Sequence, residues 1–230
     1  MSAARWEPDP QLRYLVAACN GSGKSTLLAW LARAFLAAPW MGCVIIDPKA
    51  DRQMHALAPM ASPWQTAQPR PGRIVRIVPP ADPASPLAPC AAGCEPVLSR
   101  VYQAGNCLLV IDETQMVAGQ YVFPPSLLRI YQQGRARQIP VLAATTEPVR
   151  IPTWIRSQSR GFFCGAIGEG PQLSNMAALM RQDARAFSAS MRGLPPYHFL
   201  YWQDSWAAAH RPPEEVHVGR TRIPRKKQEA

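Results

Sequence analysis

The stretch that decides the fold is Ala18-Cys19-Asn20-Gly21-Ser22-Gly23-Lys24-Ser25-Thr26. It matches the phosphate-binding loop pattern G-x4-G-K-[ST], except that alanine stands at the first glycine position. Small residues let successive backbone N–H groups curl around phosphate oxygens, and the following helix aims its positive amino terminus at the same anion. The pattern predicts that Asn20–Thr26 bind nucleotide phosphates, that Lys24 reaches the β- and γ-phosphates, and that the Ser25 hydroxyl holds Mg²⁺.

The flanking segments supply the context that a phosphate-binding loop needs. Leu12–Ala18 is a short apolar run typical of a strand, and Lys24–Ala38 repeats apolar residues at the spacing of a helix. A glycine-rich turn that occurred by chance is the alternative, but it would rarely lie between such a strand and such a helix. We therefore expect ATP and Mg²⁺ as the ligands of this loop.

Two adjacent carboxylates, Asp112 and Glu113, end the apolar run that starts at Cys107. A buried strand cannot keep two charges, so both should project from its carboxyl end, where open α/β sheets bind ligands. We expect Asp112 to orient Mg²⁺, directly or through water, and Glu113 to polarise the attacking water as a general base. A solvated strand end is the alternative, and the presence of both motifs in one chain argues against it.

Apolar runs and helical repeats alternate along the rest of the chain, which predicts an α/β fold with a mostly parallel central sheet flanked by helices. The predicted strands are 12–18, 43–47, 73–78, 107–112, 139–145, 161–167 and 197–202. The predicted helices are 24–38, 97–104, 125–137, 151–159 and 173–191. Residues 59–96 are rich in proline, and we interpret them as an irregular insertion that carries the strand 73–78.

Length and charge bound the domain organisation and the class of partner. The 230 residues are 47% hydrophobic, which predicts one folded domain over 1–210 and excludes wholesale disorder. The basic stretch 211–230 reads as a mobile tail. The net charge of +10 favours a polyanionic partner such as nucleic acid, and a basic protein that merely stays soluble is the alternative.

Cysteine spacing and hydropathy argue against a zinc site and a membrane anchor. Cys90 and Cys94 form the one close cysteine pair of the sequence, and no second pair at finger spacing accompanies them. The most apolar segment, Leu27–Ile46, is interrupted by charged and helix-breaking residues and reads as a helix, a turn and a strand. The first ten residues lack an apolar stretch, so we expect no signal peptide and a cytosolic protein.

Beyond these general motifs, the chain contains a further set of short segments: Asp47-Pro48-Lys49, Ile111-Asp112-Glu113, Gly134-Arg135, Ala144-Thr145-Thr146-Glu147-Pro148, Ile151-Pro152 and Ile155-Arg156-Ser157-Gln158. In these segments the chain resembles, over roughly residues 12–168, the FtsK–HerA superfamily of DNA-pumping ATPases, and most of all the compact genome-packaging ATPases of tectivirus-like and poxvirus-like viruses. This resemblance implies a RecA-like P-loop NTPase core, a homo-oligomeric ring of five or six subunits, and double-stranded DNA as the moving cargo.

The same resemblance implies two further catalytic residues. In this family the strand after the carboxylates typically ends in Thr-Gln, whose glutamine senses the γ-phosphate; here that place falls on Thr146, which has a shorter reach. Arg135 stands where the family places an arginine finger, which would stabilise transition-state charge on a neighbouring subunit's nucleotide. A solvated arginine at a helix end is the alternative for Arg135, and Arg137 is the second candidate for the finger.

The resemblance thus implies an ATP-driven translocase of double-stranded DNA. The compact length favours the genome-packaging motor of a virus with an internal membrane or a double-jelly-roll capsid, located in the host cytoplasm and at the packaging vertex of the virion. A capsid-vertex or membrane protein would be its docking partner. The alternatives are a plasmid-transfer or chromosome-type translocase core and, in another class, a P-loop regulatory switch or small-molecule kinase.

Overall fold

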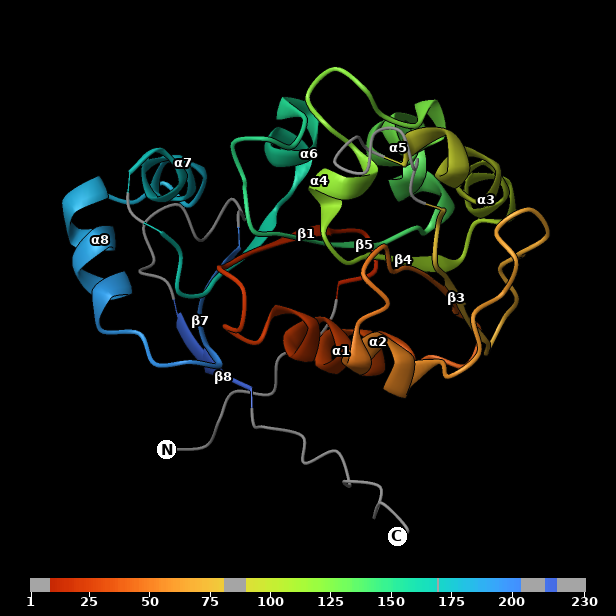
Figure 1. The fold of residues 1–230 in the computed structure, drawn as a ribbon, viewed down its shortest axis with the longest axis horizontal. Coiled ribbons are helices and arrows are strands. Elements are labelled where there is room, and N and C mark those ends of the chain that lie inside the picture. Colours follow the sequence, from red (N-terminus) through yellow and green to blue (C-terminus); the bar gives the residue numbers. More distant parts are fainter. Residues whose placement is uncertain (1–8, 81–89, 169, 204–213, 219–230) are drawn as a thin grey trace, which may run out of the picture.

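The computed structural model describes residues 9–80, 90–168, 170–203 and 214–218. These residues form an eight-stranded sheet in the order β3-β2-β4-β5-β1-β6-β7-β8 (Figure 1). The six strands from β3 to β6 are parallel, and β7 and β8 are antiparallel to their neighbours. The strand bounds are β1 Arg13–Ala17, β2 Gly42–Ile46, β3 Ile74–Ile77, β4 Cys107–Ile111, β5 Val141–Thr145, β6 Gly161–Cys164, β7 His198–Gln203 and β8 Glu214–His217. The predicted α/β fold with a mostly parallel sheet is confirmed.

Helices cover both faces of this sheet (Figure 1). On one face lie α1 Lys24–Phe35 and α2 Arg52–Leu57. The opposite face carries α3 Ala91–Ala104, α4 Thr114–Val117, α5 Pro125–Gln133 and α6 Thr153–Gln158. The short 3-10 helix η1 Gly134–Arg137 follows α5, while α7 Pro171–Leu179 and α8 Ala184–Arg192 lie beside the β7 end of the sheet.

Successive residues of the central strands pack into two different cores. In β1, Leu15 and Ala17 belong to the core beneath α3 and α5, whereas Tyr14 and Val16 pack with the residues of α1. All residues of β1, β2, β4 and β5 are buried. A parallel sheet that is covered on both faces favours apolar residues at successive positions, which explains the long apolar runs in the sequence.

The parallel arrangement brings four loops to one edge of the sheet. The carboxyl end of β1 is level with that of β5, where Ala17 pairs with Thr145, and that of β2 is level with that of β4, where Ile46 pairs with Ile111. The loops that leave these strands therefore begin side by side at the carboxyl edge. This is the edge at which open α/β sheets bind ligands.

The bounds of two predicted helices differ most from those in the structure. The predicted helix 173–191 is two helices, because Arg181 adopts a left-handed conformation and Asp183 caps α8 by accepting hydrogen bonds from Arg185 N and Ala186 N. The helix expected from residue 97 begins at Ala91, so the irregular insertion predicted over 59–96 ends in helical residues. Pro96 lies inside α3, where it removes a single backbone hydrogen bond near the first turns.

The tail expected to be mobile from residue 211 contains a strand. Glu214–His217 form β8, which pairs with β7, and the N–H of Val218 donates to the carbonyl of Tyr197 at 3.0 Å. Val216 and Val218 both pack against the core around α1, since alternate residues of a strand share a face. The expectation is therefore wrong for 214–218, and 211–213 and 219–230 lie outside the described residues.

Candidate active site

The loop between β1 and α1 has the backbone of a phosphate cradle. Gly21 and Gly23 have positive φ angles of 77° and 101°, a region that favours glycine. A Cβ at Gly23 would also lie 2.6 Å from the ring of Tyr197. Ala18, which stands where the motif has glycine, is not among the described residues with positive φ, so alanine is tolerated there.

Lys24 and Glu113 face each other at the floor of this loop. The Lys24 ammonium donates to the carbonyl of Cys19 at 3.2 Å and lies 3.7 Å from Glu113 Oε1. Both side chains are almost fully buried. Burial lowers the pKa of Lys24, while the carboxylates of Glu113 and Asp112 act in the opposite direction. A buried ammonium held by so few partners is well placed to meet phosphate oxygens.

Ser25 and Asp112 form the part of the site that fits a divalent cation. The Ser25 hydroxyl donates to Asp112 Oδ2 at 3.1 Å, and the buried Asp112 Oδ1 has no hydrogen-bond partner among the described residues. Burial, followed by the nearby charges of Asp51 and Glu113, raises the pKa of Asp112 to about 7. A cation at this position would satisfy the free oxygen and offset the repulsion among the carboxylates. The predicted pair of Mg²⁺ ligands is therefore chemically suited to the ion.

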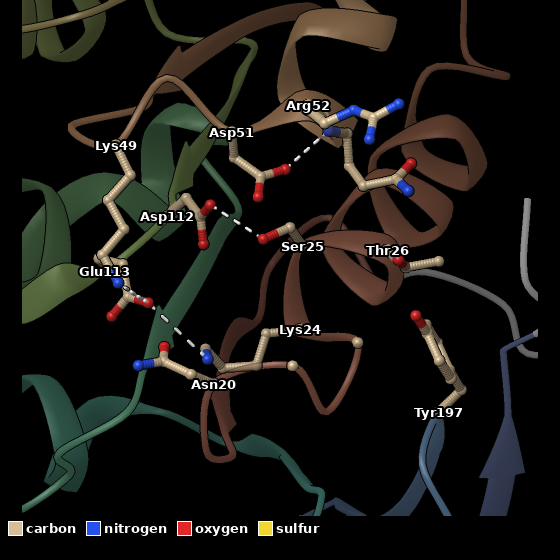
Figure 2. A pocket seen from close by; sticks show the side chains of 13 residues that line it. Asn20, Lys24, Ser25, Thr26, Lys49, Asp51, Arg52, Asp112, Glu113 and Tyr197 are labelled. Atoms are coloured by element: carbon tan, nitrogen blue, oxygen red, sulfur yellow. Dashed lines mark hydrogen bonds and ion pairs between the residues drawn. The ribbon is translucent and has the colours of Figure 1, made fainter. Parts of the chain in front are cut away.

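The loop after β2 adds a second cation that the sequence analysis did not assign. Lys49 Nζ donates to Glu113 Oε1 at 2.7 Å from a side chain that is 42% exposed (Figure 2). The loop is held by the buried Asp47, whose carboxylate accepts from the N–H of Asp51 at 2.9 Å and from Arg76 Nη1 at 3.0 Å. Asp47 thus fixes the turn that points Lys49 at Glu113.

Glu113 is surrounded by donors on both of its carboxylate oxygens. Oε1 meets Lys49 and Lys24, and Oε2 accepts from Gln115 Nε2 and lies 3.4 Å from Thr146 Oγ1. Burial acts to raise the pKa of Glu113, but the hydrogen bond from Lys49 and the charge of Lys24 hold it below its usual value. Glu113 is therefore a carboxylate, the form in which it can accept a proton.

These residues open onto one pocket of about 340 Å³. Its lining contains the predicted Asn20, Gly21, Gly23, Lys24, Ser25, Thr26, Asp112 and Glu113, together with Lys49, Asp51, Arg52, Gln53 and Tyr197. Ser22 turns inward, where its hydroxyl donates to the Cys19 carbonyl at 2.7 Å. Tyr197 lies beside Thr26, on the far side of the P-loop from Glu113 (Figure 2).

Comparisons with known proteins give a match at the level of fold. No family model and no curated protein matches the sequence. The genome packaging NTPase B204 from Sulfolobus turreted icosahedral virus 2, solved with sulfate, is similar over 91% of this chain and 97% of its own, with 15% identity and a TM-score of 0.64. VirB4 of Thermoanaerobacter pseudethanolicus is similar over 90% of this chain and 89% of its own, with 10% identity and a TM-score of 0.60.

The chain shares its fold with the NTPase B204 and with VirB4. The resemblance seen in the sequence is thus matched by the fold over almost the whole of both chains. B204 has also been solved in complex with ATP-γS, at a TM-score of 0.64 to this chain. Among the described residues, no helix is long and apolar enough to cross a bilayer.

The hydroxyl of Thr146, the residue at the predicted sensor position, is already engaged by other side chains. Thr146 follows β5, and Oγ1 accepts from Gln115 Nε2 at 2.8 Å while lying 3.4 Å from Glu113. Gln115 also accepts from the Thr145 hydroxyl at 2.7 Å. Sequence reasoning missed Gln115, whose one signal was its position two residues after the acid.

Arg135 and Arg137 lie at the opposite, amino edge of the sheet, in η1 before β5. Arg135 is exposed, and its Nε donates to Gln11 Oε1 at 3.0 Å. Arg137 donates to the carbonyls of Tyr102 and Gln103 at 2.6 and 3.0 Å, and its guanidinium covers the Tyr102 ring. Strand β5 alone spans roughly 13 Å, so neither arginine reaches its own P-loop. Because Arg137 already bonds to the carbonyls at the end of α3, Arg135 is the better candidate for an arginine finger.

Proposed function

We propose that this chain is an ATPase that pumps double-stranded DNA, and that it is the genome-packaging motor of a virus with an internal membrane or a double-jelly-roll capsid. The observation that carries the proposal is the convergence of Lys24, Asp112 and Glu113 on one pocket at the carboxyl edge. The similarity of fold to a genome packaging NTPase, over 97% of that protein, supports the biological role.

Each group of site residues has a separate role in the proposed hydrolysis of ATP. The backbone N–H groups of the P-loop and the ammonium of Lys24 bind the β- and γ-phosphates. Ser25 and Asp112 hold Mg²⁺, which when bound neutralises charge on the phosphate oxygens. Glu113 takes a proton from the attacking water, because its buried carboxylate is kept charged by the two neighbouring ammonium groups.

The proposed cargo follows from charge and fold together. The net charge of +10 favours contacts to DNA phosphates, which carry no sequence information. The predicted homo-oligomeric ring is supported by Arg135, which is exposed and lies at the edge away from its own P-loop. A finger in that place can complete only the site of another subunit.

The test is ATP turnover with and without duplex DNA, on a sample whose assembly state is measured by light scattering. We expect oligomers whose turnover rises with duplex DNA of any sequence. Because binding releases counterions, the DNA affinity should fall by roughly a thousandfold between low and moderately raised salt. Packaging, rather than plasmid transfer, further requires that the protein co-purify with assembling capsids.

The alternative functions predict other results in the same assay. A small-molecule kinase would transfer phosphate to a specific acceptor and would show no response to DNA. A regulatory switch would hydrolyse ATP slowly and release a partner protein. If duplex DNA neither binds to the assembled protein nor raises its turnover, the translocase proposal fails.

A further inference from the structure

The side chain of Gln115 lies at the centre of a hydrogen-bond network that joins β4 to β5. Its Nε2 donates to Glu113 Oε2 and to Thr146 Oγ1, and its Oε1 accepts from Thr145 Oγ1. Thr145 Oγ1 in turn accepts from the N–H of Glu147 at 3.0 Å. All three polar positions of the glutamine amide, two N–H groups and one carbonyl, are therefore used.

The chemistry of the partners fixes the direction of every hydrogen bond in this network. A charged Glu113 can only accept, so the amide NH₂ of Gln115 must face it, and the amide oxygen must face Thr145. The Thr145 hydroxyl then donates to Gln115 and accepts from Glu147. The hydroxyl of Thr146 accepts from Gln115 and turns its own proton toward Glu113. Because the Thr146 hydroxyl already makes these hydrogen bonds, it is poorly placed to bond to the γ-phosphate.

The backbone holds Gln115 in place for this role. It belongs to α4, which begins directly after Glu113, and Glu113 itself has the left-handed angles φ 62° and ψ 67°. The carbonyl of the next residue, Met116, accepts from the N–H of Cys90 at 2.8 Å, which ties α4 to the start of α3. Thr145 is fully buried at the end of β5. Both ends of the network are therefore attached to fixed elements.

Two further donors to Glu113, Lys49 and Lys24, are cations that a triphosphate would attract. Lys49 is 42% exposed, and Lys24 lies in the P-loop itself. Once both ammonium groups turn toward phosphate, the neutral donors remain, and Gln115 makes a closer hydrogen bond to the Glu113 carboxylate than Thr146 does at 3.4 Å. A neutral donor lowers the basicity of a carboxylate less than an ammonium does, because its hydrogen bond is weaker.

We propose that Gln115 is the positioning residue that aligns Glu113 with the attacking water and links it to the loop after β5, where the family resemblance places a γ-phosphate sensor at Thr146. The glutamine thus comes from the segment after β4 instead of from the end of β5. This inference rests on the proposed ATPase function. It predicts that occupancy of the γ-phosphate position is felt at the backbone of Glu147, through Gln115 and Thr145.

The first test compares Gln115→Ala with Gln103→Ala, a matched loss of a glutamine that is exposed on α3. We expect kcat of Gln115→Ala to fall by roughly ten- to a hundredfold, because a displaced base is costly, while its Kd for ATP stays within about twofold. Gln103→Ala should behave as wild type. Thr145→Val should also reduce kcat, and Thr145→Ser, which keeps the hydroxyl, should have the kcat of the wild type. Because both residues act through one network, the double variant Gln115→Ala with Thr145→Val should be no slower than Gln115→Ala alone.

The second test does not depend on turnover. Amide hydrogen exchange over 144–150 should differ between the ATP-γS and ADP complexes of the wild type, and Gln115→Ala should remove that difference. If Gln115→Ala turns over like Gln103→Ala while Lys24→Ala is inactive, the inference is overturned and the ATPase proposal stands. If the wild type hydrolyses no more ATP than Lys24→Ala, both fail. Should Gln115→Ala not fold, the Thr145→Val and Thr145→Ser pair decides by the same criteria.

Discussion

Lys24 and Glu113 at the carboxyl edge of the sheet have different surroundings from Arg135 at the amino edge. At the carboxyl edge, Lys24 and Glu113 are buried and make their contacts within the same chain. At the amino edge, Arg135 is exposed and has a single neutral contact, Gln11, among the hydrogen bonds of the described residues. The contacts among the P-loop site residues are therefore made within one subunit, whereas the guanidinium of Arg135 is exposed on the surface of that subunit.

This difference distinguishes the catalytic residues that act within one subunit from an arginine that would act only in an oligomer. Buried charges must be satisfied where they lie, so the geometry of the carboxyl edge is decided during folding. An exposed guanidinium has no such constraint, and its position at the far end of β5 excludes a role at its own pocket. We expect substitutions at the carboxyl edge to act within each subunit and substitutions at Arg135 to act between subunits.

The largest effect is expected at Glu113 and Lys24. Glu113→Gln should lower turnover on the order of ten-thousandfold, because it removes the general base and keeps the shape of the side chain. It should bind ATP at least as tightly as wild type, since Lys24 and Lys49 lose their carboxylate partner and are free for phosphate. Lys24→Ala should lose both turnover and ATP affinity. Single-turnover kinetics and nucleotide binding measure the two effects, and normal turnover in Glu113→Gln would refute the assignment of the base.

The next largest effect is expected from Arg135. Arg135→Ala should bind ATP normally and turn over on the order of a thousandfold more slowly. Mixing it with Lys24→Ala should restore part of the activity, because some interfaces then join an intact Arg135 to an intact P-loop. Arg137→Ala should instead lower stability, since Arg137 holds the carbonyls at the end of α3. The absence of rescue in a confirmed mixed oligomer would argue against a finger that acts between subunits.

The sequence predicted those parts of the site whose residues are consecutive. The P-loop and the Asp112–Glu113 pair each lie in one short segment, and the alternation of strands and helices placed both at the same sheet edge. Lys49 and Gln115 were not assigned roles, because their contacts depend on which strands are neighbours. Lys49 reaches Glu113 since β2 lies next to β4, and Gln115 reaches Thr145 since β4 lies next to β5.

The misplaced elements have local causes that a periodic pattern does not reveal. The apolar helical pattern continues through Met180. The left-handed residue Arg181 then separates the two helices, and the N-cap Asp183 starts α8. Strand β8 contains two glutamates and lies beyond a stretch of polar and proline residues, so composition favoured a tail. Its pairing with β7 supplies the backbone hydrogen bonds that composition does not show.

A smaller effect, on stability, is expected at the ion pair that holds the loop of Lys49. Arg76 bonds to Asp47 and to the carbonyls of Ala58 and Pro59, and both charged side chains are buried. Arg76→Met should lower the free energy of unfolding by about 3 kcal/mol, because it leaves a buried carboxylate without its partner. Arg135→Ala, its exposed control at the other edge, should change stability by less than about 0.5 kcal/mol. Denaturant unfolding measures both, and equal values would contradict the contrast between the edges.

The smallest effect concerns which edge faces DNA. If Arg135 contacts the neighbouring subunit, it is covered in the ring and DNA must meet other exposed arginines, for which the loop after β5 offers a candidate. Its Arg150 is 74% exposed and is paired to Glu147 at 2.9 Å, an exposed ion pair worth at most about 1 kcal/mol that phosphate can replace.

Arg150→Gln should therefore reduce the slope of log K against log salt concentration by about 1 for duplex DNA of any sequence. Arg135→Gln removes the same charge from the other edge and should leave the slope unchanged. The measurement is a DNA-binding titration at several salt concentrations, with ATP-γS present to keep the assembly state constant. A reduced slope for Arg135→Gln alone would place DNA at the amino edge, and would remove the reason to expect a neighbouring subunit there.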